Sequence, residues 1–229
     1  MVFTSRPQTA YLIEAVQEYP EGVGWYHYFC GPQSIRGAWC PNCQKPLLPL
    51  AIVDATDPRV DLGEMLLLSI PLMYCWRCGI PKADFYYRVI TEDEIHIVEY
   101  CKGDPEVGFP YDDYPVFFPG SPCVLRELSG DEQRALDGLS VGEIIEADIV
   151  NSAPHLVGQP HQIGGRPFLL QIDSGDALSC PICGQLLSFF ANIGNRCADP
   201  RGIVGYSHVQ LLFHVCHRCS VVGARNRAD

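Results

Sequence analysis

The 229-residue sequence predicts a β-rich protein with few short helices, made of two repeated halves that are each clipped by a zinc ion. Three observations predict this fold. Four Cys-x-x-Cys pairs occur in two sets of nearly equal spacing, and a short apolar run leads into the second pair of each set. In addition, 21 glycines and 19 prolines keep strands short and connections irregular. Hydrophobic residues make up 47% of the chain, which is enough to form a core.

The cysteine pairs form an internal repeat. Within a half, the two pairs are separated by 31 residues in the first half and by 32 in the second. An Asp-Pro-Arg sequence lies in each of these intervals, at 57–59 and at 199–201. Such regular spacing indicates a duplication. The pairs are Cys40/Cys43, Cys75/Cys78, Cys180/Cys183 and Cys216/Cys219.

The duplication divides the chain into an N-terminal repeat over residues 1–100, a connecting segment over 101–150 and a C-terminal repeat over 151–229. Charge is distributed unevenly along it, because residues 84–148 hold 16 acidic and 4 basic residues. The remainder holds 11 acidic and 12 basic residues, so the formal net charge of −11 arises in the middle of the chain. An acidic chain argues against nucleic-acid binding, which needs positive charge to displace the counterions of phosphates.

The cysteine pairs predict two structural zinc sites. A Cys-x-x-Cys turn directs two thiolates at one ion, and two turns supply the four sulfurs that tetrahedral Zn²⁺ prefers, about 2.3 Å from the metal. Four protein ligands leave no coordination position open for a substrate, so neither ion is expected to be catalytic. The first site would be formed by Cys40, Cys43, Cys75 and Cys78, and the second by Cys180, Cys183, Cys216 and Cys219.

Other interpretations of these residues stay open. The pairs could be reduced core cysteines, or one of them a redox dithiol, although such a dithiol is usually a single pair at a helix N-terminus. His217 lies within the last turn and could replace a sulfur ligand; a place outside the ligand shell is favoured because both cysteines of that turn are present. Gly79 and Gly184 suit the left-handed position that often follows such a turn. The four remaining cysteines are expected to be buried thiols: Cys30, Cys101, Cys123 and Cys197.

Three further elements are predicted from local patterns. The apolar positions of residues 9–19 follow a helical period, which predicts a short N-terminal helix. Residues 85–90 and 95–100 are typical of a strand pair joined by an acidic turn. Ser129 and Glu132 have the spacing of a capping box, which predicts a helix that runs through Leu136.

An aromatic and acidic stretch, residues 109–119, lies between prolines in the connecting segment. Its aromatic side chains could pack between the halves, or they could form an exposed recognition loop for a basic partner, since rigid aromatics make strong interface contacts. In the second interpretation the partner-binding residues are Tyr111, Asp112, Asp113, Tyr114 and Phe117.

The remaining signals favour a non-enzymatic, cytoplasmic protein. The first residues contain no apolar stretch typical of a secretory signal, and the longest apolar stretch, Met65–Met73, is too short to cross a bilayer. Twelve cysteines without a signal peptide are more typical of metal ligands than of disulfides. His155 and His161 lie in a Pro/Gly-rich loop, and no nucleophile motif, phosphate-binding loop or dinucleotide fingerprint accompanies them.

One stretch of the second half resembles a known signature. His161-Gln162-Ile163-Gly164-Gly165-Arg166-Pro167, continuing to Gln171 and followed by the turn from Cys180 to Gly184, resembles the bacterial YwqG-like family of unknown function. It is also similar to the repeat of programmed cell death protein 2. Residues 169–174 resemble the strand that follows in YwqG-like proteins. The first half shares the cysteine framework but lacks the glycine-glycine-proline signature.

The resemblance implies an α+β fold with an antiparallel sheet and a role in holding a protein client. Relatives of the first kind are suspected immunity proteins, and the second family acts as a dedicated chaperone of a ribosomal protein. Either client would be basic, because it must contact nucleic acid. The expected function is therefore that of a zinc-stabilised protein that sequesters a basic partner, most plausibly a bacterial toxin. The alternatives are a chaperone or adaptor of a ribosomal-type client, a thiol–disulfide oxidoreductase and an unrecognised hydrolase.

Overall fold

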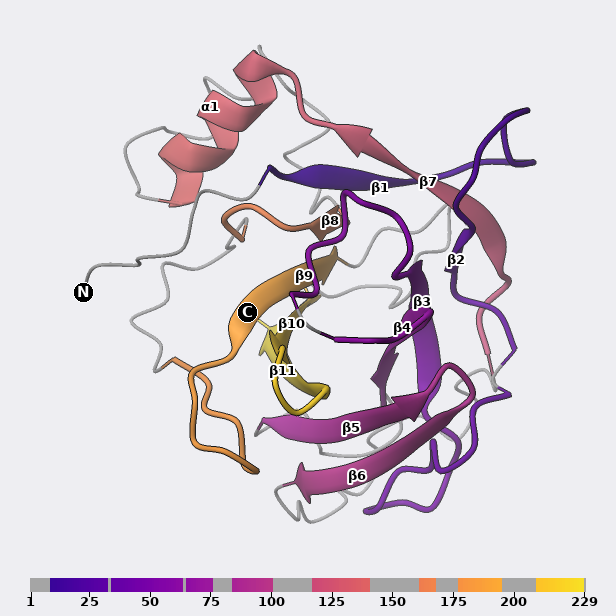
Figure 1. Ribbon diagram of the computed structural model, residues 1–229, viewed down its shortest axis with the longest axis vertical. Helices are drawn as coiled ribbons and strands as arrows, with labels where there is room; N and C mark the ends of the chain where they lie inside the picture. Colours follow the sequence, from indigo (N-terminus) through magenta and orange to yellow (C-terminus); the bar gives the residue numbers. More distant parts are fainter. Residues whose placement is uncertain are drawn as a thin grey trace.

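The computed structural model describes residues 9–32, 34–63, 65–75, 84–100, 117–140, 161–167, 177–194 and 209–228. Within these ranges, eleven strands form one antiparallel sheet in the order β4-β3-β2-β7-β1-β8-β9-β10-β11-β5-β6, and one helix, α1, follows β7 (Figure 1). The strands are β1 Tyr11–Ala15, β2 His27–Phe29, β3 Leu48–Asp54, β4 Ser69–Tyr74, β5 Phe85–Thr91, β6 Glu94–Tyr100, β7 Ser121–Glu127, β8 Gln162–Ile163, β9 Ser188–Gly194, β10 Val209–Cys216 and β11 Val221–Ala228.

The sheet curls so that β4, at one end of the order, returns to β5 and β11 near the other end. The buried Tyr87 of β5 joins these strands, because its hydroxyl donates to the carbonyl of Pro71 (2.7 Å) and accepts from the amide of Met73 (3.0 Å). β4 is the edge strand of the described part of the sheet, so the Tyr87 hydroxyl satisfies backbone groups on the side where β4 has no described neighbour. Pro71 itself has no amide hydrogen to satisfy there. The side chains of β4 from Ile70 to Tyr74 are buried in the core that the curl encloses.

The strand order shows how the duplicated sequence folds. Read from β4, the order is β4-β3-β2-β7; read inward from β10, it is β10-β9-β8-β1. Strands β1 to β4 of the first repeat therefore correspond to β7 to β10 of the second. The first strand of each repeat is exchanged, because β2 pairs with β7 and β8 pairs with β1.

The strand registers agree with an approximate twofold axis between β1 and β7. Phe29 of β2 faces Ser121 of β7, and Ile163 of β8 faces Tyr11 of β1. Phe29 and Ile163 occupy equivalent positions in the two repeats, so their partners Ser121 and Tyr11 are equivalent too, and β7 follows β1 by 110 residues. With the same shift, the ladder between β1 and β7 is symmetric about the pair Glu14–Val124. Strand β7 lies within residues 101–150, and the sheet interleaves strands from both repeats, so the structural repeat begins earlier than the cysteine spacing alone indicates.

The N-terminal helix predicted for residues 9–19 is wrong: these residues contain β1. Leu12 and Ile13 are both buried, and the strand hydrogen-bonds to β7 on one side and β8 on the other. The helical spacing of its apolar residues is overridden by these two ladders, because a central strand satisfies its backbone on both edges while it buries side chains on both faces.

Two other local predictions are confirmed. The strand pair appears as the β5–β6 hairpin, and α1 spans Gly130–Ser140, four residues beyond the predicted Leu136. Its capping box forms as expected: the Glu132 amide donates to Ser129 Oγ (3.2 Å) and the Ser129 amide donates to the Glu132 carboxylate (2.6 Å). Arg126 of β7 then pairs with Glu132 and with Glu14 of β1, which fixes the helix to the exchanged strands.

No helix in the described ranges is long and apolar enough to cross a membrane.

The glycine pair of the signature sequence packs against the beginning of β1. Gly164 and Gly165 both have positive φ angles, 68° and 67°. A Cβ on Gly164 would lie 2.7 Å from the carbonyl oxygen of Thr9, and one on Gly165 would lie 2.5 Å from the Cβ of Ala10. The buried side-chain amide of Gln162 donates to the carbonyls of Gly164 and Arg166 and holds this turn in shape. The glycine pair therefore has a structural role: it leaves room for the residues that begin β1 to pack against the turn after β8.

Replacing Gly165 with alanine is expected to destabilise the protein by about 1–3 kcal/mol more than the same change at Gly22. Both glycines have positive φ, but a Cβ on Gly22 meets nothing within 4 Å, so Gly22→Ala measures the backbone strain alone. Urea unfolding of the two variants measures the difference. Equal losses of stability would show that the close approach to Ala10 is relieved without cost.

Candidate metal centres

The second cysteine cluster contains all four predicted ligands. The Sγ atoms of Cys180, Cys183, Cys216 and Cys219 all lie within 4.8 Å of one another. The first pair precedes β9, and the second pair connects the end of β10 to the beginning of β11. The thiols are free, with Cys180 and Cys216 buried and the other two partly exposed. Sheet pairing thus places two turns that are distant in sequence around one point.

The first cluster brings together three of its four predicted ligands. Cys40, Cys43 and Cys75 have Sγ atoms within 4.8 Å of one another, and Cys40 and Cys75 are buried. Cys78 lies outside the described residues. Cys75 follows β4 directly, and Cys216 is the last residue of β10. Equivalent cysteines of the two repeats therefore lie at the same end of corresponding strands.

The first turns of the two clusters have the same hydrogen-bond pattern. Cys40 and Cys180 each donate their amide to the carbonyl five residues later, both at 2.8 Å. The amides of Gln44 and Gly184 donate back to the carbonyls of these cysteines, at 2.9 Å and 2.8 Å. Gln44 and Gly184 both have positive φ, 59° and 70°, which confirms the left-handed position predicted for Gly184. Gly79 lies outside the described residues.

The sulfur separations suit a tetrahedral metal site. Cys43 Sγ lies 3.7 Å from Cys75 Sγ, and Cys183 Sγ lies 3.7 Å from Cys216 Sγ. A tetrahedron with metal–sulfur bonds of about 2.3 Å has edges of about 3.8 Å, whereas a disulfide needs about 2.05 Å. In both cases the close contact joins the first Cys-x-x-Cys turn of a half to its second. A redox dithiol would instead join two cysteines of one turn.

Four thiolates within 4.8 Å of one another would repel strongly in the absence of a cation. The backbone amide of Gln185 lowers the pKa of Cys183 to about 7, while burial raises the pKa of Cys216. Cys183 therefore ionises more readily than Cys216, and a divalent cation would compensate the charge of the thiolates that form at such a site. The donor set fits Zn²⁺, for which Cys₄ is a common structural ligand set.

The other predicted residues are only partly within the described ranges. Cys30 and Cys123 are buried thiols, as expected, and burial raises the pKa of Cys123 to about 12, which makes it unreactive. Phe117 is 47% exposed. Several predicted residues lie outside the described ranges: Cys101, Cys197, His155, Tyr111, Asp112, Asp113 and Tyr114.

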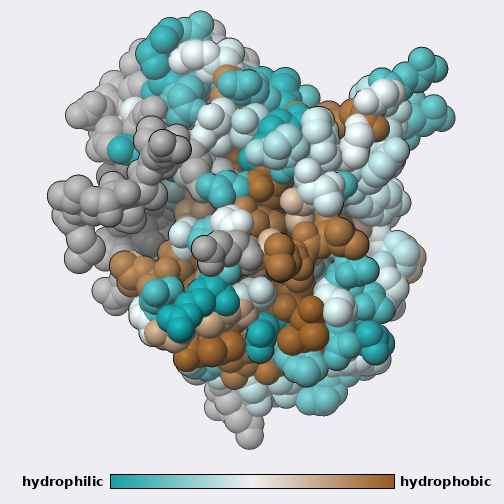
Figure 2. All heavy atoms as spheres, in the orientation of Figure 1, coloured by the Kyte–Doolittle hydropathy of each residue, from teal (hydrophilic) through white to brown (hydrophobic). Residues whose placement is uncertain are grey.

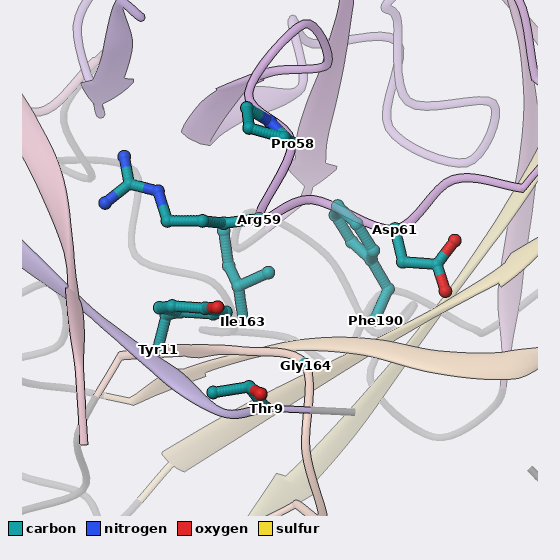
Figure 3. A pocket seen from close by; sticks show the side chains of 8 residues that line it. All are labelled: Thr9, Tyr11, Pro58, Arg59, Asp61, Ile163, Gly164 and Phe190. Atoms are coloured by element: carbon teal, nitrogen blue, oxygen red, sulfur yellow. The ribbon is translucent and has the colours of Figure 1, made fainter. Parts of the chain in front are cut away.

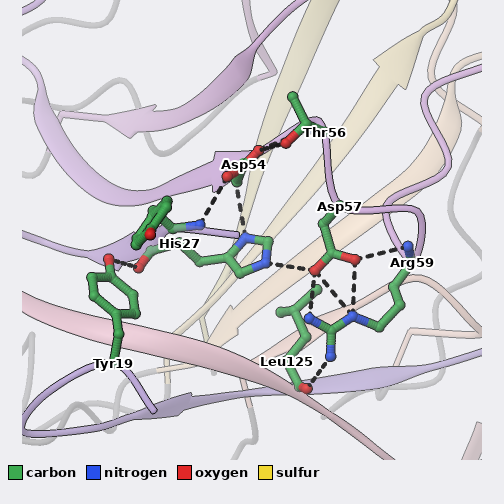
Figure 4. A network of polar contacts seen from close by, with 8 residues as sticks. Tyr19, His27, Asp54, Thr56, Asp57, Arg59 and Leu125 are labelled. Carbon is green, nitrogen blue, oxygen red and sulfur yellow. Dashed lines mark hydrogen bonds and ion pairs between the residues drawn. The ribbon is translucent and has the colours of Figure 1, made fainter. Parts of the chain in front are cut away.

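A buried polar network in the first repeat was not predicted as a functional group of residues. His27 Nε2 donates to Asp57 Oδ2 (2.8 Å), and the Arg59 guanidinium pairs with the same carboxylate (2.6 Å) while donating to the carbonyl of Leu125 on β7 (2.7 Å) (Figure 4). The side chain of Asp57 is 0% exposed. The repeated Asp-Pro-Arg was the sequence signal for this network, which anchors the loop after β3 to strands β2 and β7.

The hydrogen bonds fix the protonation state of His27. The amide of Asp54 donates to Nδ1 (3.1 Å), so this nitrogen accepts and the proton is on Nε2. Burial lowers the pKa of His27, although Asp57 opposes the shift. Burial alone would raise the pKa of Asp57, but the hydrogen bonds from Arg59 and His27 outweigh it and hold this pKa below its usual range. The pair is therefore a neutral imidazole beside a carboxylate.

His161 occupies the position before β8 that corresponds to His27 in the first repeat. Its ring packs 4.6 Å from that of Phe29, and both ring nitrogens are buried without a hydrogen-bond partner among the described residues. Burial lowers the pKa of His161 to about 4. The folded protein thus disfavours the imidazolium form, which the unfolded chain adopts below about pH 6.5.

Acidification from pH 6 to pH 4.5 is expected to destabilise the wild type more than a His161→Leu variant, by up to about 1.4 kcal/mol per pH unit. The pKa of His161 is lower in the folded state than in the unfolded state, so the unfolded state binds the proton more readily. Stability therefore falls as the pH is lowered through this window. Urea unfolding in excess zinc measures both slopes. His96→Gln is the control, since His96 is exposed beside Glu94. Parallel slopes for wild type and His161→Leu would contradict the prediction.

A pocket of about 180 Å³ lies where the two repeats meet (Figure 3). Tyr11 of β1, Arg59 and Asp61 of the first repeat, and Gly164 and Phe190 of the second contribute to its wall. Figure 3 shows the guanidinium of Arg59 and the carboxylate of Asp61 pointing in opposite directions. The volume is below the roughly 300–1,000 Å³ of typical small-molecule sites, so the pocket suits a single side chain or a small ion rather than a nucleotide cofactor.

The fold and these clusters define a β-rich protein with a curled antiparallel sheet and two cysteine clusters compatible with metal binding. No family model, no curated protein and no solved structure matches the chain. The resemblance to the YwqG-like family and to the repeat of programmed cell death protein 2 therefore stays a prediction.

Proposed function

We propose that this chain is a zinc-stabilised, non-enzymatic protein that sequesters a basic protein partner and acts as an immunity protein that neutralises a bacterial toxin. The observation that carries the proposal is the concentration of charge: residues 84–148 contain 16 acidic and 4 basic residues, while the rest of the chain is nearly neutral. A surface of one sign attracts a partner of the opposite sign and accelerates association.

The metal clusters support a binding role over catalysis. Two Cys₄ sites supply stability at fixed positions and keep no ligand position open for a reacting molecule. In the proposed role the two Zn²⁺ ions are structural, and a reducing compartment such as the cytoplasm would keep their eight thiols available. The cross-turn sulfur contacts of 3.7 Å favour this role over a thiol–disulfide enzyme.

The described surface offers apolar side chains of the kind that anchor protein interfaces. Tyr26, Trp39 and Phe117 are 61%, 54% and 47% exposed. Figure 2 shows apolar side chains gathered in the middle and lower part of one face, with polar residues above and to the right of them. Apolar patches rimmed by polar groups are typical of interaction sites. Phe117 lies in the acidic segment, so an aromatic anchor and negative charge occur together there.

The test begins with affinity capture of the tagged protein from its native cells and identification of the retained protein. We expect one basic partner that inhibits growth when expressed alone and is neutralised by co-expression. Affinity should fall at least about 10-fold between 50 and 200 mM salt. A partner that neither inhibits growth nor is basic would overturn the proposal, and a harmless ribosomal-type client would favour the chaperone alternative.

Site-directed variants test the proposed surface. Combined Asp112→Asn, Asp113→Asn and Tyr114→Ala changes are expected to weaken partner binding at least about 10-fold by calorimetry. The control is Asp131→Asn on α1, an acidic residue that is 72% exposed and also belongs to the acidic segment. Unchanged binding by the triple variant would show that the partner uses another surface.

A further inference from the structure

The loop after β3 in the first repeat reaches the second cysteine cluster. Near its beginning, the loop is fixed by Asp57 and Arg59, which bind His27 of β2 and the Leu125 carbonyl of β7. Farther along, Val60 and Leu62 are buried in the core, and Gly63 receives support from Asp61, whose carboxylate accepts the Gly63 amide (3.0 Å). The loop therefore approaches the second repeat with a defined backbone.

The contact at the far end of this loop is between Gly63 and His217. A Cβ on Gly63 would lie 3.2 Å from Nδ1, 3.3 Å from Cγ and 3.4 Å from Cβ of His217. The imidazole thus lies directly over the side of Gly63 that a side chain would occupy, and Gly63 has a φ of 57°. The Nδ1 atom is buried and has no hydrogen-bond partner in the described part of the chain, so the contact is made by packing.

The position of His217 is set by the second cysteine cluster. His217 lies between Cys216 and Cys219, in a turn closed by the amides of Cys219 and Ser220, which both donate to the carbonyl of Cys216 (3.3 and 3.0 Å). Ser220 has a positive φ of 54°, so the turn is tight and contains a strained residue. A metal bound by both cysteines would hold this turn closed, and with it the imidazole that covers Gly63.

We propose that metal binding at the second cysteine cluster is coupled, through the contact of His217 with Gly63, to the conformation of the first-repeat loop of residues 57–63. The metal of one repeat then orders a loop of the other. Because coupling is reciprocal, a loop that cannot accept His217 must weaken metal binding at the second cluster and leave the first cluster unaffected. The inference rests on the proposed metal at the second cluster.

The test uses the full chain loaded with ¹¹³Cd²⁺, which replaces zinc and gives one NMR resonance for each site. The second-site resonance is assigned from its change in a Cys183→Ser variant. A competing chelator then measures the affinity of each site in wild type, Gly63→Ala, Gly22→Ala, His217→Ala and the double variant Gly63→Ala/His217→Ala. Gly22 is the matched control for backbone strain, because it has a φ of 78° and a Cβ there meets nothing within 4 Å.

We expect Gly63→Ala to weaken cadmium binding at the second site by about 5-fold or more, with the first site unchanged. Gly22→Ala should leave both sites unchanged, and in the His217→Ala background Gly63→Ala should have no further effect. Equal affinities in Gly63→Ala and Gly22→Ala, or equal weakening of both sites, would overturn the coupling while leaving the metal sites intact. Failure of the wild type to bind two ions would instead overturn the proposed function together with the coupling.

A measurement on the wild type does not depend on any variant folding. Chelator titration removes the two ions in sequence, and hydrogen exchange at the amides of Val60, Leu62 and Gly63 is followed at each step. We expect protection of these amides to be lost with the second-site resonance, at least about 10-fold in exchange rate. Loss of protection that follows only the first-site resonance, or that precedes both, would overturn the proposal.

Discussion

Cys180→Ala is expected to abolish metal binding at the second site and to destabilise the protein by more than about 3 kcal/mol, since structural zinc contributes roughly 10–16 kcal/mol to folding in zinc-finger peptides. The reason is that only three sulfurs would remain, too few to complete a tetrahedral site between the turn before β9 and the turn after β10. Elemental analysis should fall from two zinc ions per chain to one. Guanidinium unfolding should show the loss of stability.

The control for this change is Cys123→Ala. Both cysteines are buried, with exposures of 2% for Cys180 and 1% for Cys123, but only Cys180 belongs to a cluster. Cys123→Ala removes one buried sulfur and should cost about 1 kcal/mol, with two zinc ions retained. If Cys180→Ala retained two ions and unfolded at the same denaturant concentration as Cys123→Ala, Cys180 would be a core thiol and not a metal ligand.

Asp57→Asn is expected to destabilise the protein by about 2–4 kcal/mol. Breaking a buried ion pair by removing one partner typically costs about 3–5 kcal/mol, and the lower range applies here because Arg59 is 29% exposed and can recover some hydration. The variant leaves Nε2–H of His27 facing an amide and removes the negative charge that compensates the Arg59 guanidinium. Asp93→Asn is the control, since the Arg36–Asp93 pair is 65% and 63% exposed and should contribute less than about 1 kcal/mol.

The pH dependence of this network has a defined sign. Both His27 and Asp57 have folded pKa values below their usual ones, so in each case the unfolded chain binds the proton more readily. The contribution of His27 is complete above about pH 6.5 and declines below it, while that of Asp57 declines below about pH 4. Asp57 opposes the lowering of the His27 pKa, so Asp57→Asn lowers that pKa further. The stability difference between wild type and Asp57→Asn should therefore widen between pH 7 and pH 5 and narrow below about pH 4 as Asp57 is protonated, as measured by unfolding at pH 7, 5 and 3.5. A difference independent of pH would contradict the assigned charge states.

The cysteine clusters could be predicted from the sequence because a Cys-x-x-Cys turn is a local structure. The spacing of Cys180 and Cys183 determines how their sulfurs converge, and the duplication indicates which pairs belong together. The β5–β6 hairpin and the cap of α1 were predictable for the same reason, because Ser129 and Glu132 interact within one helical turn. In each case the interacting groups are close in sequence or repeated.

The parts of the fold and of the candidate site that could not be predicted depend on contacts between residues that are distant in sequence. β1 was predicted to be helical because the spacing of Leu12 and Ala15 carries no information about β7 and β8, which supply its hydrogen bonds. The partners His27 and Asp57 are 30 residues apart, and their pairing depends on the path of β3. The repeated Asp-Pro-Arg marked the position of this network without indicating its partner. The contact of Gly63 with His217 joins the two repeats and has no local signal at all.

The strand exchange has a consequence for synthesis of the chain. β1 leaves the ribosome first, but its partners β7 and β8 begin at residues 121 and 162. At about 5–20 residues per second, β1 waits roughly 5–20 seconds for the first of them. During that interval β2, β3 and β4 can pair with each other, whereas the apolar residues Leu12 and Ile13 have no ladder to join. β1 therefore joins the sheet only after β7 has been synthesised, later than β2, β3 and β4 can pair with one another.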